Sequence, residues 1–148
     1  MIKMENIKID FGRPEDGWVI INIKIGNFEL EIDTSDVPNP IQQLCRSINF
    51  SLNNMEFQIL FSLEPNFNVF RFSPKNGLII FQILFLENNQ EILMKEIKGS
   101  FEETVLPFYR AIKRFLTLEY EEKHWGRISD YEKGELDNLI NKYKTSYE

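Results

Sequence analysis

Residues 18–33 read W-V-I-I-N-I-K-I-G-N-F-E-L-E-I-D, and their alternation of apolar and polar side chains decides the fold class. From Trp18 to Ile25 one face carries β-branched residues, which predicts a strand. Gly26-Asn27 is a two-residue link. Residues 28–33 then alternate again, with three apolar side chains on one face and three acids on the other. The stretch predicts an antiparallel hairpin with one buried face.

The preceding residues extend this hairpin into a meander. Residues 7–11 (I-K-I-D-F) alternate in the same way, which predicts another strand. Residues 12–17 (G-R-P-E-D-G) are a turn by composition. The opening third of the chain therefore predicts three antiparallel strands.

A helix and a second run of strands are expected next. Pro40 fits the first helical position after an Asn39 cap, and Asn53-Asn54 ends the pattern. The apolar positions at helical spacing are Ile41, Leu44, Cys45, Ile48 and Leu52. Alternation then predicts strands over 57–63, 67–73, 78–87 and 92–98. The strand at 78–87 is apolar on both faces, so we expect it to be central and covered on both sides, or covered by a partner chain.

The start of the next helix has two interpretations. Ser100 and Glu103 have capping-box spacing, but that start puts Pro107 inside the helix, where proline costs about 3 kcal/mol. A start at Thr104 puts Pro107 in the first turn, where N–H groups lack helical partners anyway. We therefore prefer a helix over 104–122.

A short last helix over 130–144 completes the pattern. Its inward-facing residues are Leu136, Leu139, Ile140 and Tyr143. The elements together predict an α+β fold, with an antiparallel sheet of about seven strands in two meanders. Two main helices, at 40–53 and 104–122, pack on this sheet. No linker divides the sequence, so a single domain is expected over 1–148.

Composition narrows the compartment and the partners. Hydrophobic residues make up 43% of the chain and include 13 Phe, enough for a core without disulfides or metal. Lone Cys45 is read as a buried structural thiol. The start of the chain lacks a signal-peptide pattern, and no apolar run is long enough to span a bilayer. A net charge of −6 disfavours nucleic acid. We expect a cytoplasmic protein that binds neither nucleic acid nor membrane.

The sequence offers few residues from which a catalytic or metal site could be built. His124 with Glu119, Glu121 and Glu122 could suggest a metal site, but transition-metal sites usually use two or more His or Cys. A solvated helix end is the simpler interpretation. A hydrolase would need a base, and His124 is the one imidazole in the chain.

Three further pairs have ordinary structural interpretations. Glu64 and Glu87 could pair as carboxylates for glycosidase-type chemistry, yet Glu64 precedes Pro65 in a turn, where exposure is expected. Ser35-Asp36 and Ser129-Asp130 read as turn and helix-cap residues. We therefore predict no catalytic residue, no metal and no cofactor, and not an enzyme.

Acidic side chains form the first candidate binding surface. Glu29, Glu31 and Asp33 share one strand face, and Asp36 follows. Such surfaces steer basic partners towards a protein. A second acidic cluster consists of Glu119, Glu121, Glu122, Asp130, Glu132, Glu135 and Asp137. Ordinary solvation is the alternative for both.

The two tryptophans are the second candidate. Trp18 stands beside a turn, and Trp125 lies in the loop between the last two helices. Tryptophan is a common energetic anchor at interfaces, but it is as often a core residue. Both interpretations stay open.

The order of features resembles known families. A Trp-led strand, Gly17-Trp18-Val19-Ile20, leads to a Ser-Asp-x-Pro-x-Pro turn at 35–40; a strand ending in Glu64-Pro65 follows, and Trp125 lies in the tail. This order is similar to that of small bacterial domain families, some of which look like immunity proteins of toxin–immunity systems. The resemblance implies an acidic domain that occupies a toxin and blocks it without catalysis. It assigns no binding residues.

These observations give two hypotheses. The first is a non-catalytic acidic binding protein, an immunity-type inhibitor that binds a basic toxin domain through Glu29, Glu31, Asp33, Asp36, Trp18 and Trp125. The alternative is a small-ligand-binding or homodimeric assembly domain, because a strand that is apolar on both faces could line a cavity or form a dimer seam.

Overall fold

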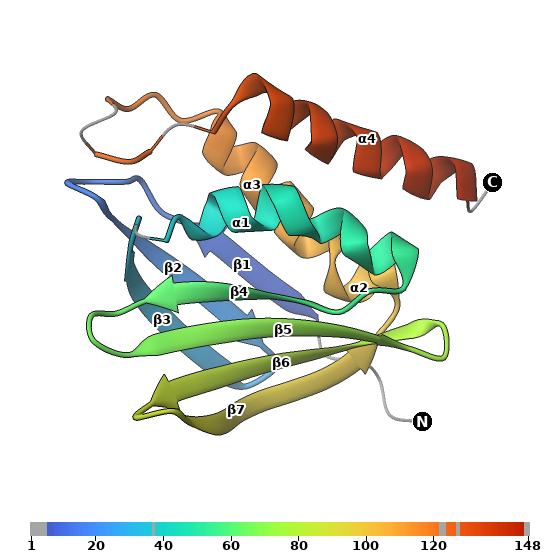
Figure 1. Ribbon diagram of the computed structural model, residues 1–148, viewed down its shortest axis with the longest axis horizontal. Helices are drawn as coiled ribbons and strands as arrows, with labels where there is room; N and C mark the ends of the chain where they lie inside the picture. The colour runs from blue at the N-terminus through green and yellow to red at the C-terminus, as the bar shows by residue number, and fades with distance from the viewer. Residues whose placement is uncertain (1–5, 37, 122–123, 127, 147–148) are drawn as a thin grey trace.

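The strands of this protein form two antiparallel sheets. A computed structural model describes residues 6–36, 38–121, 124–126 and 128–146. The first sheet has the order β1-β2-β3 and the second the order β4-β5-β6-β7 (Figure 1). The strands are β1 (Ile7–Phe11), β2 (Trp18–Ile25), β3 (Phe28–Ser35), β4 (Phe57–Ser62), β5 (Phe67–Lys75), β6 (Leu78–Glu87) and β7 (Gln90–Gly99).

The two predicted meanders are confirmed, but they do not join into one sheet. Where β3 passes β4, the Thr34 hydroxyl donates a hydrogen bond to the Ser62 carbonyl at 3.1 Å. This side-chain bond stands where a continuous sheet would need a backbone ladder. The strands of the two sheets also run at an angle to each other (Figure 1).

The first predicted helix is confirmed over its first half. The α-helix α1 (Pro40–Ser47) starts after Asn39, whose side chain accepts hydrogen bonds from the backbone N–H groups of Ile41 and Gln42. The chain then tightens into the 3₁₀ helix η1 (Ile48–Asn53), and Asn54 stops it in the left-handed conformation. The side chain of Leu52 lies outside the described residues.

The preferred start at Thr104 is wrong, because both signals around Pro107 are used in turn. The short helix α2 (Phe101–Thr104) begins with the capping box of Ser100 and Glu103. The chain breaks at Val105, and α3 (Leu106–Leu116) restarts with Pro107 in its first turn. Breaking the helix keeps the cap and avoids an interior proline.

The helix α3 also ends before the predicted residue 122, which itself lies outside the described residues. At its end Thr117 donates both its N–H and its hydroxyl to the Arg114 carbonyl. These bonds satisfy a carbonyl group that a continued helix would bond through a later N–H. Beyond this point, Leu118 and Tyr120 pack against the core from non-helical backbone.

The last helix is longer than the short one predicted. It is α4 (Asp130–Ser146), with 17 residues. Leu136 and Leu139 are buried as expected. The side chains of Ile140 and Tyr143 lie outside the described residues.

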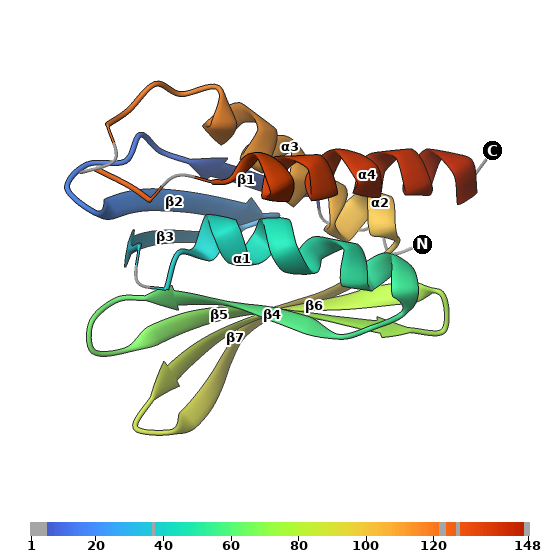
Figure 2. The same cartoon turned by 45° about the horizontal axis from the view of Figure 1, so that its top comes forward.

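One hydrophobic core joins both sheets and the helices. The Phe108 ring of α3 lies 5.8, 5.1 and 5.3 Å from the rings of Phe70, Phe72 and Phe81 in the second sheet. The same helix contacts the first sheet, since Phe115 stands 6.3 Å edge-on from Phe11. In Figure 2 the second sheet lies below α1 and α4, whereas the first sheet lies at the level of the helices, with β1 beside α3.

The strand β6 is central; its core face is buried, and its opposite face is only partly covered. Ile79, Phe81 and Ile83 are buried in the core. On the opposite face Leu84 is buried, whereas Leu78 is 38% exposed. The expectation that the protein itself covers both faces is therefore wrong, because the helices and the other sheet lie on the core side (Figure 2). Separately, none of the described helices has the length and apolar character needed to cross a membrane.

Glu132 anchors α4 to α1 and should be important for stability. It is 4% exposed, and its Oε1 accepts hydrogen bonds from Arg46 at 2.8 Å and Gln42 at 3.1 Å. Its Oε2 accepts the Ser129 N–H, and the Ser129 hydroxyl accepts the Glu132 N–H, which completes a capping box. Removing the carboxylate leaves these donors unpaired.

We expect Glu132→Ala to lower the free energy of unfolding by about 2 kcal/mol, which combines a lost cap with a lost partly buried ion pair. Urea denaturation followed by circular dichroism measures it. Asn138→Ala, at an exposed site on the same helix, is the matched control and should stay within about 0.5 kcal/mol of the parent protein. Equal stability of the two variants would show that α4 does not depend on this carboxylate.

Candidate functional site

The strand meander presents one exposed, charged face, which we call the outer sheet face. Alternate residues of β1, β2 and β3 point away from the core. The exposed members are Lys8, Asp10, Ile20, Asn22, Lys24, Glu29, Glu31 and Asp33. Four acids and two lysines give this face a net charge of −2.

Strand register arranges these side chains in rows across the sheet. Lys8, Lys24 and Glu29 form one row, because they are opposite each other in the two ladders. Asp10, Asn22 and Glu31 form the next row in the same way.

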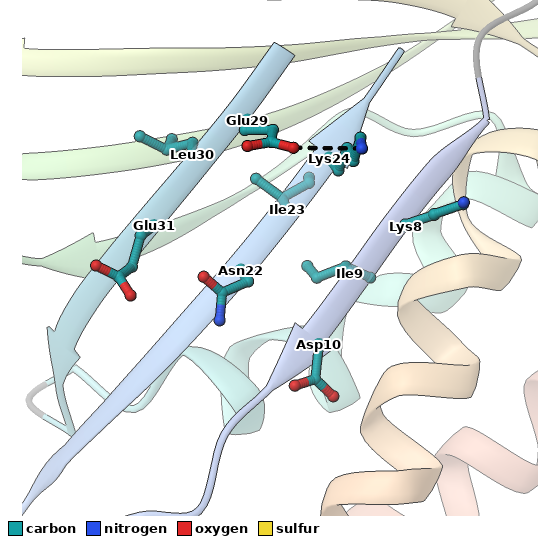
Figure 3. A pocket seen from close by; sticks show the side chains of 9 residues that line it. All are labelled: Lys8, Ile9, Asp10, Asn22, Ile23, Lys24, Glu29, Leu30 and Glu31. Carbon is teal, nitrogen blue, oxygen red and sulfur yellow. Dashed lines mark ion pairs between the residues drawn. The ribbon is translucent and has the colours of Figure 1, made fainter. Parts of the chain in front are cut away.

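A shallow depression of about 580 Å³ lies between these rows. Its floor follows the aligned residues Ile9, Ile23 and Leu30, whose positions lie between the two rows (Figure 3). Because Ile9 and Ile23 are buried in the core, the floor of the depression is strand backbone. The two rows therefore form the walls of an open trough across three strands.

Charge is unevenly distributed along the outer sheet face. The ammonium of Lys24 lies 3.3 Å from a carboxylate oxygen of Glu29, so this row is largely neutralised (Figure 3). Asp10 and Glu31 stand in the following row, and Asp33 lies one further row along, opposite Ile20. The acidic end of the face therefore consists of Asp10, Glu31 and Asp33.

The predicted binding residues are only partly brought together. Glu29, Glu31 and Asp33 share the outer sheet face, as the alternation indicated. Asp36 is half-buried beyond the end of β3, where its N–H donates to the Gly17 carbonyl at 3.0 Å. Trp18 is half-buried opposite Ser35, in line with the exposed residues of β2.

Trp125 does not belong to this surface. Its side chain is fully buried, and its ring stands 6.3 Å edge-on from Phe115. Its indole N–H has no hydrogen-bond partner in the described structure. The core interpretation therefore replaces the interface interpretation for Trp125, because packing against the end of α3 leaves no surface for a partner to contact.

Five contributors to the face were not singled out from the sequence, among them Lys8 and Ile20. Asp10, Asn22 and Lys24 belong to it through their neighbours on adjacent strands. The signal was present, because a two-residue link fixes the register of a hairpin and places Lys24 opposite Glu29. Following that register would have shown that Lys24 partly neutralises the acidic charge at one end of the face.

The second acidic cluster is only partly brought together in the structure. Glu132 is buried in its ion pair, and Asp137 accepts a hydrogen bond from Lys113 at 3.0 Å. Glu122 lies outside the described residues. The predicted carboxylate pair, Glu64 and Glu87, is exposed at the ends of two turns. Of the remaining acids of the cluster, Glu119 and Asp130 line one surface depression, and Glu119 and Glu121 line another.

His124 has a structural role in the described chain. Its Nδ1 accepts the Asp16 N–H at 3.0 Å, and its carbonyl accepts the Gly17 N–H. Beside it, Arg13 donates to the Glu119 carbonyl at 2.6 Å. These bonds tie the β1–β2 turn to the loop before α4. Within the described ranges, no group of three or more potential metal ligands is found.

Comparison with known protein families, curated proteins and solved structures found no match to this chain.

Cys45 offers a direct test of the buried-thiol interpretation. The side chain is 2% exposed, and burial, with a smaller contribution from the nearby Glu132 charge, raises the pKa of the thiol to about 12. The thiolate is the reactive form, so it is scarce in the folded protein at neutral and mildly alkaline pH.

We expect Cys45 to resist a thiol-specific aromatic disulfide reagent at about pH 8, near the ordinary thiol pKa, and to react stoichiometrically once the chain is denatured. Because the pKa of the Cys45 thiol is higher in the folded than in the unfolded protein, its contribution to folding stability is fully present below the unfolded pKa. It is lost as pH rises from there towards about 12. Rapid labelling of the native protein would contradict this burial.

Proposed function

We propose that this protein is a non-catalytic, acidic binding protein, an immunity-type inhibitor that holds a basic toxin domain against its outer sheet face. The observation that carries the proposal is the acidic end of that face. There Asp10 projects from β1 and Glu31 and Asp33 project from β3, on either side of β2, all with exposed side chains. A basic protein surface is the chemistry that complements them.

The backbone beneath these carboxylates is already ordered. Each of the three residues lies within a ladder, so binding would not have to fix the main chain. On this side of the interface, the conformational entropy lost on association is therefore confined to side chains. Carboxylates presented together also create a field that attracts cationic partners and raises their association rate.

Apolar contact is available next to the acids. Ile20 is 44% exposed and lies opposite Asp33. Trp18 lies two residues earlier on the same face, at the start of β2. Interfaces commonly combine such an apolar anchor with surrounding charge. The partner surface that fits would place Lys or Arg over the acidic end and an apolar side chain on Ile20.

The Lys24–Glu29 ion pair refines which acids should matter most. Glu29 already has a cationic neighbour at 3.3 Å, so its charge is partly compensated before any partner arrives. A partner should therefore gain more from Glu31 and Asp33 than from Glu29.

The partner itself should be identified first. A pull-down of the tagged protein from its native host, including the products of neighbouring genes, should recover a stoichiometric basic protein. High salt should weaken its retention, because exposed charges are screened. Recovery of this chain alone would remove the support for a toxin partner.

With the partner in hand, we expect Glu31→Lys and Asp33→Lys each to slow association roughly tenfold at low ionic strength, with little effect in high salt. Glu29→Lys should have a smaller effect. Glu87→Lys, an exposed site on the second sheet with the same change in net charge, is the matched control. Stopped-flow fluorescence measures the rates, and equal slowing by all four substitutions would show that net charge acts rather than this face.

A further inference from the structure

The outermost strand of the second sheet is exposed along much of its length. β7 pairs with β6 on one side and lies at the end of the strand order. Ile92 and Leu93 are each 51% exposed, and Met94 is 37% exposed. The β6–β7 hairpin also extends away from the helices (Figure 2). Exposed apolar edge strands are places where another strand can add.

Two of the other outer strands, β1 and β4, carry side-chain hydrogen bonds on their open edges. On β1, the guanidinium of Arg114 donates to the Ile9 carbonyl at 3.0 Å. On β4, the Gln43 amide bonds both the carbonyl and the N–H of Leu60, at 3.2 and 3.1 Å. These side chains from α3 and α1 occupy backbone groups that would otherwise accept a new strand. In β7 the pairing register itself limits which strand can add, because it determines which backbone groups point outwards.

The hairpin turn determines which backbone groups of β7 face outwards. Asn88 and Asn89 both have positive φ, 49° and 64°, and the pair Glu87–Gln90 closes this two-residue turn. Such a turn is closed by a hydrogen-bonded pair, after which bonded and non-bonded pairs alternate. The N–H and C=O of Glu91 and Leu93 therefore point away from β6.

A bulge changes this alternation halfway along β7. Leu93 pairs with Leu84 and Lys95 pairs with Ile83, so Met94 is an extra residue. Beyond the bulge, the outward positions become Glu96 and Lys98. The outward residues are odd-numbered before Met94 and even-numbered after it.

We propose that a second copy of this chain adds to β7 in antiparallel orientation, with the two-fold axis between Met94 and Lys95. In this register Glu91 faces Lys98 and Leu93 faces Glu96, so outward backbone groups meet along both halves. The two four-stranded sheets would join into one continuous sheet across the dimer.

Two of the side-chain contacts in this register are complementary. Glu91 and Lys98 pair with Leu86 and Ile80 of β6, so both lie on the face away from the core. Opposite charges therefore meet, and the symmetry repeats the contact. On the core side, Ile92 meets Ile97.

Glu91 already forms an ion pair with Arg71 of its own chain. Its carboxylate accepts two hydrogen bonds from Arg71, at 2.6 and 3.3 Å, which lower the pKa of Glu91. Lys98 of a second copy would extend this pair into a network. A competing register centred on Leu93 would place Glu91 opposite Lys95. The backbone groups of Lys95 point towards β6, so that register lacks the necessary hydrogen bonds.

Sedimentation velocity of the full chain from micromolar to millimolar concentration tests the proposal. We expect a monomer–dimer equilibrium in which Lys98→Glu raises the dimer dissociation constant about tenfold, because two symmetric contacts become repulsive. The double variant Glu91→Lys/Lys98→Glu should restore association, since the charges are exchanged. Lys75→Glu, at an exposed site on β5 with the same change in net charge, is the control and should change the constant by less than about threefold. Circular dichroism confirms that each variant is folded.

A strict monomer throughout this range would overturn the proposal. So would a dimer that Lys98→Glu leaves unchanged, or a dimer that the double variant does not restore. A dimer weakened by Lys95→Glu but not by Lys98→Glu would assign the competing register and reject this one. Because β7 and the outer sheet face belong to different sheets, none of these results bears on the proposed toxin-binding role.

Discussion

The packing of α3 against both sheets is the contact on which the rest of the structure depends. A three-stranded or four-stranded meander with one apolar face needs a second layer to bury that face. Phe108 supplies this layer for the second sheet, through ring contacts with Phe70, Phe72 and Phe81. Phe115, two turns later on the same helix, reaches Phe11 of the first sheet. One helix therefore gives two separate sheets a common core.

This arrangement also explains why the candidate surfaces lie where they do. Since the helices are gathered on the core side, the opposite face of each sheet is left to solvent (Figure 2). On the first sheet that face carries charged side chains, which solvation favours and which a basic partner would recognise. On the second sheet it keeps exposed apolar residues, such as Leu78 of β6. Solvation alone does not account for that choice of residues.

Local pattern predicted the elements of this fold well, and failed where distant segments meet. The strands around Gly26-Asn27 and the cap at Asn39 follow from nearest-neighbour chemistry, and they are confirmed. The break at Val105 could not be chosen from the sequence, because two valid helix signals competed within a few residues. The division into two sheets and the burial of Trp125 depend on contacts between distant segments. For the candidate site, the acids on β3 were predictable, whereas their neighbours required the register of the meander.

The bulge at Met94 illustrates how one extra residue can both protect an edge and select a partner. A regular strand has its outward groups at every second residue, so it can match β7 on one side of the bulge but not on both. Added strands of unrelated proteins would therefore form half a ladder. A second copy has the same bulge in its β7. Two-fold symmetry places the part of its β7 after Met94 opposite the part of the first β7 before Met94. In the proposed dimer, the bulge that hinders pairing with a regular strand would therefore be matched by the same bulge in the second copy.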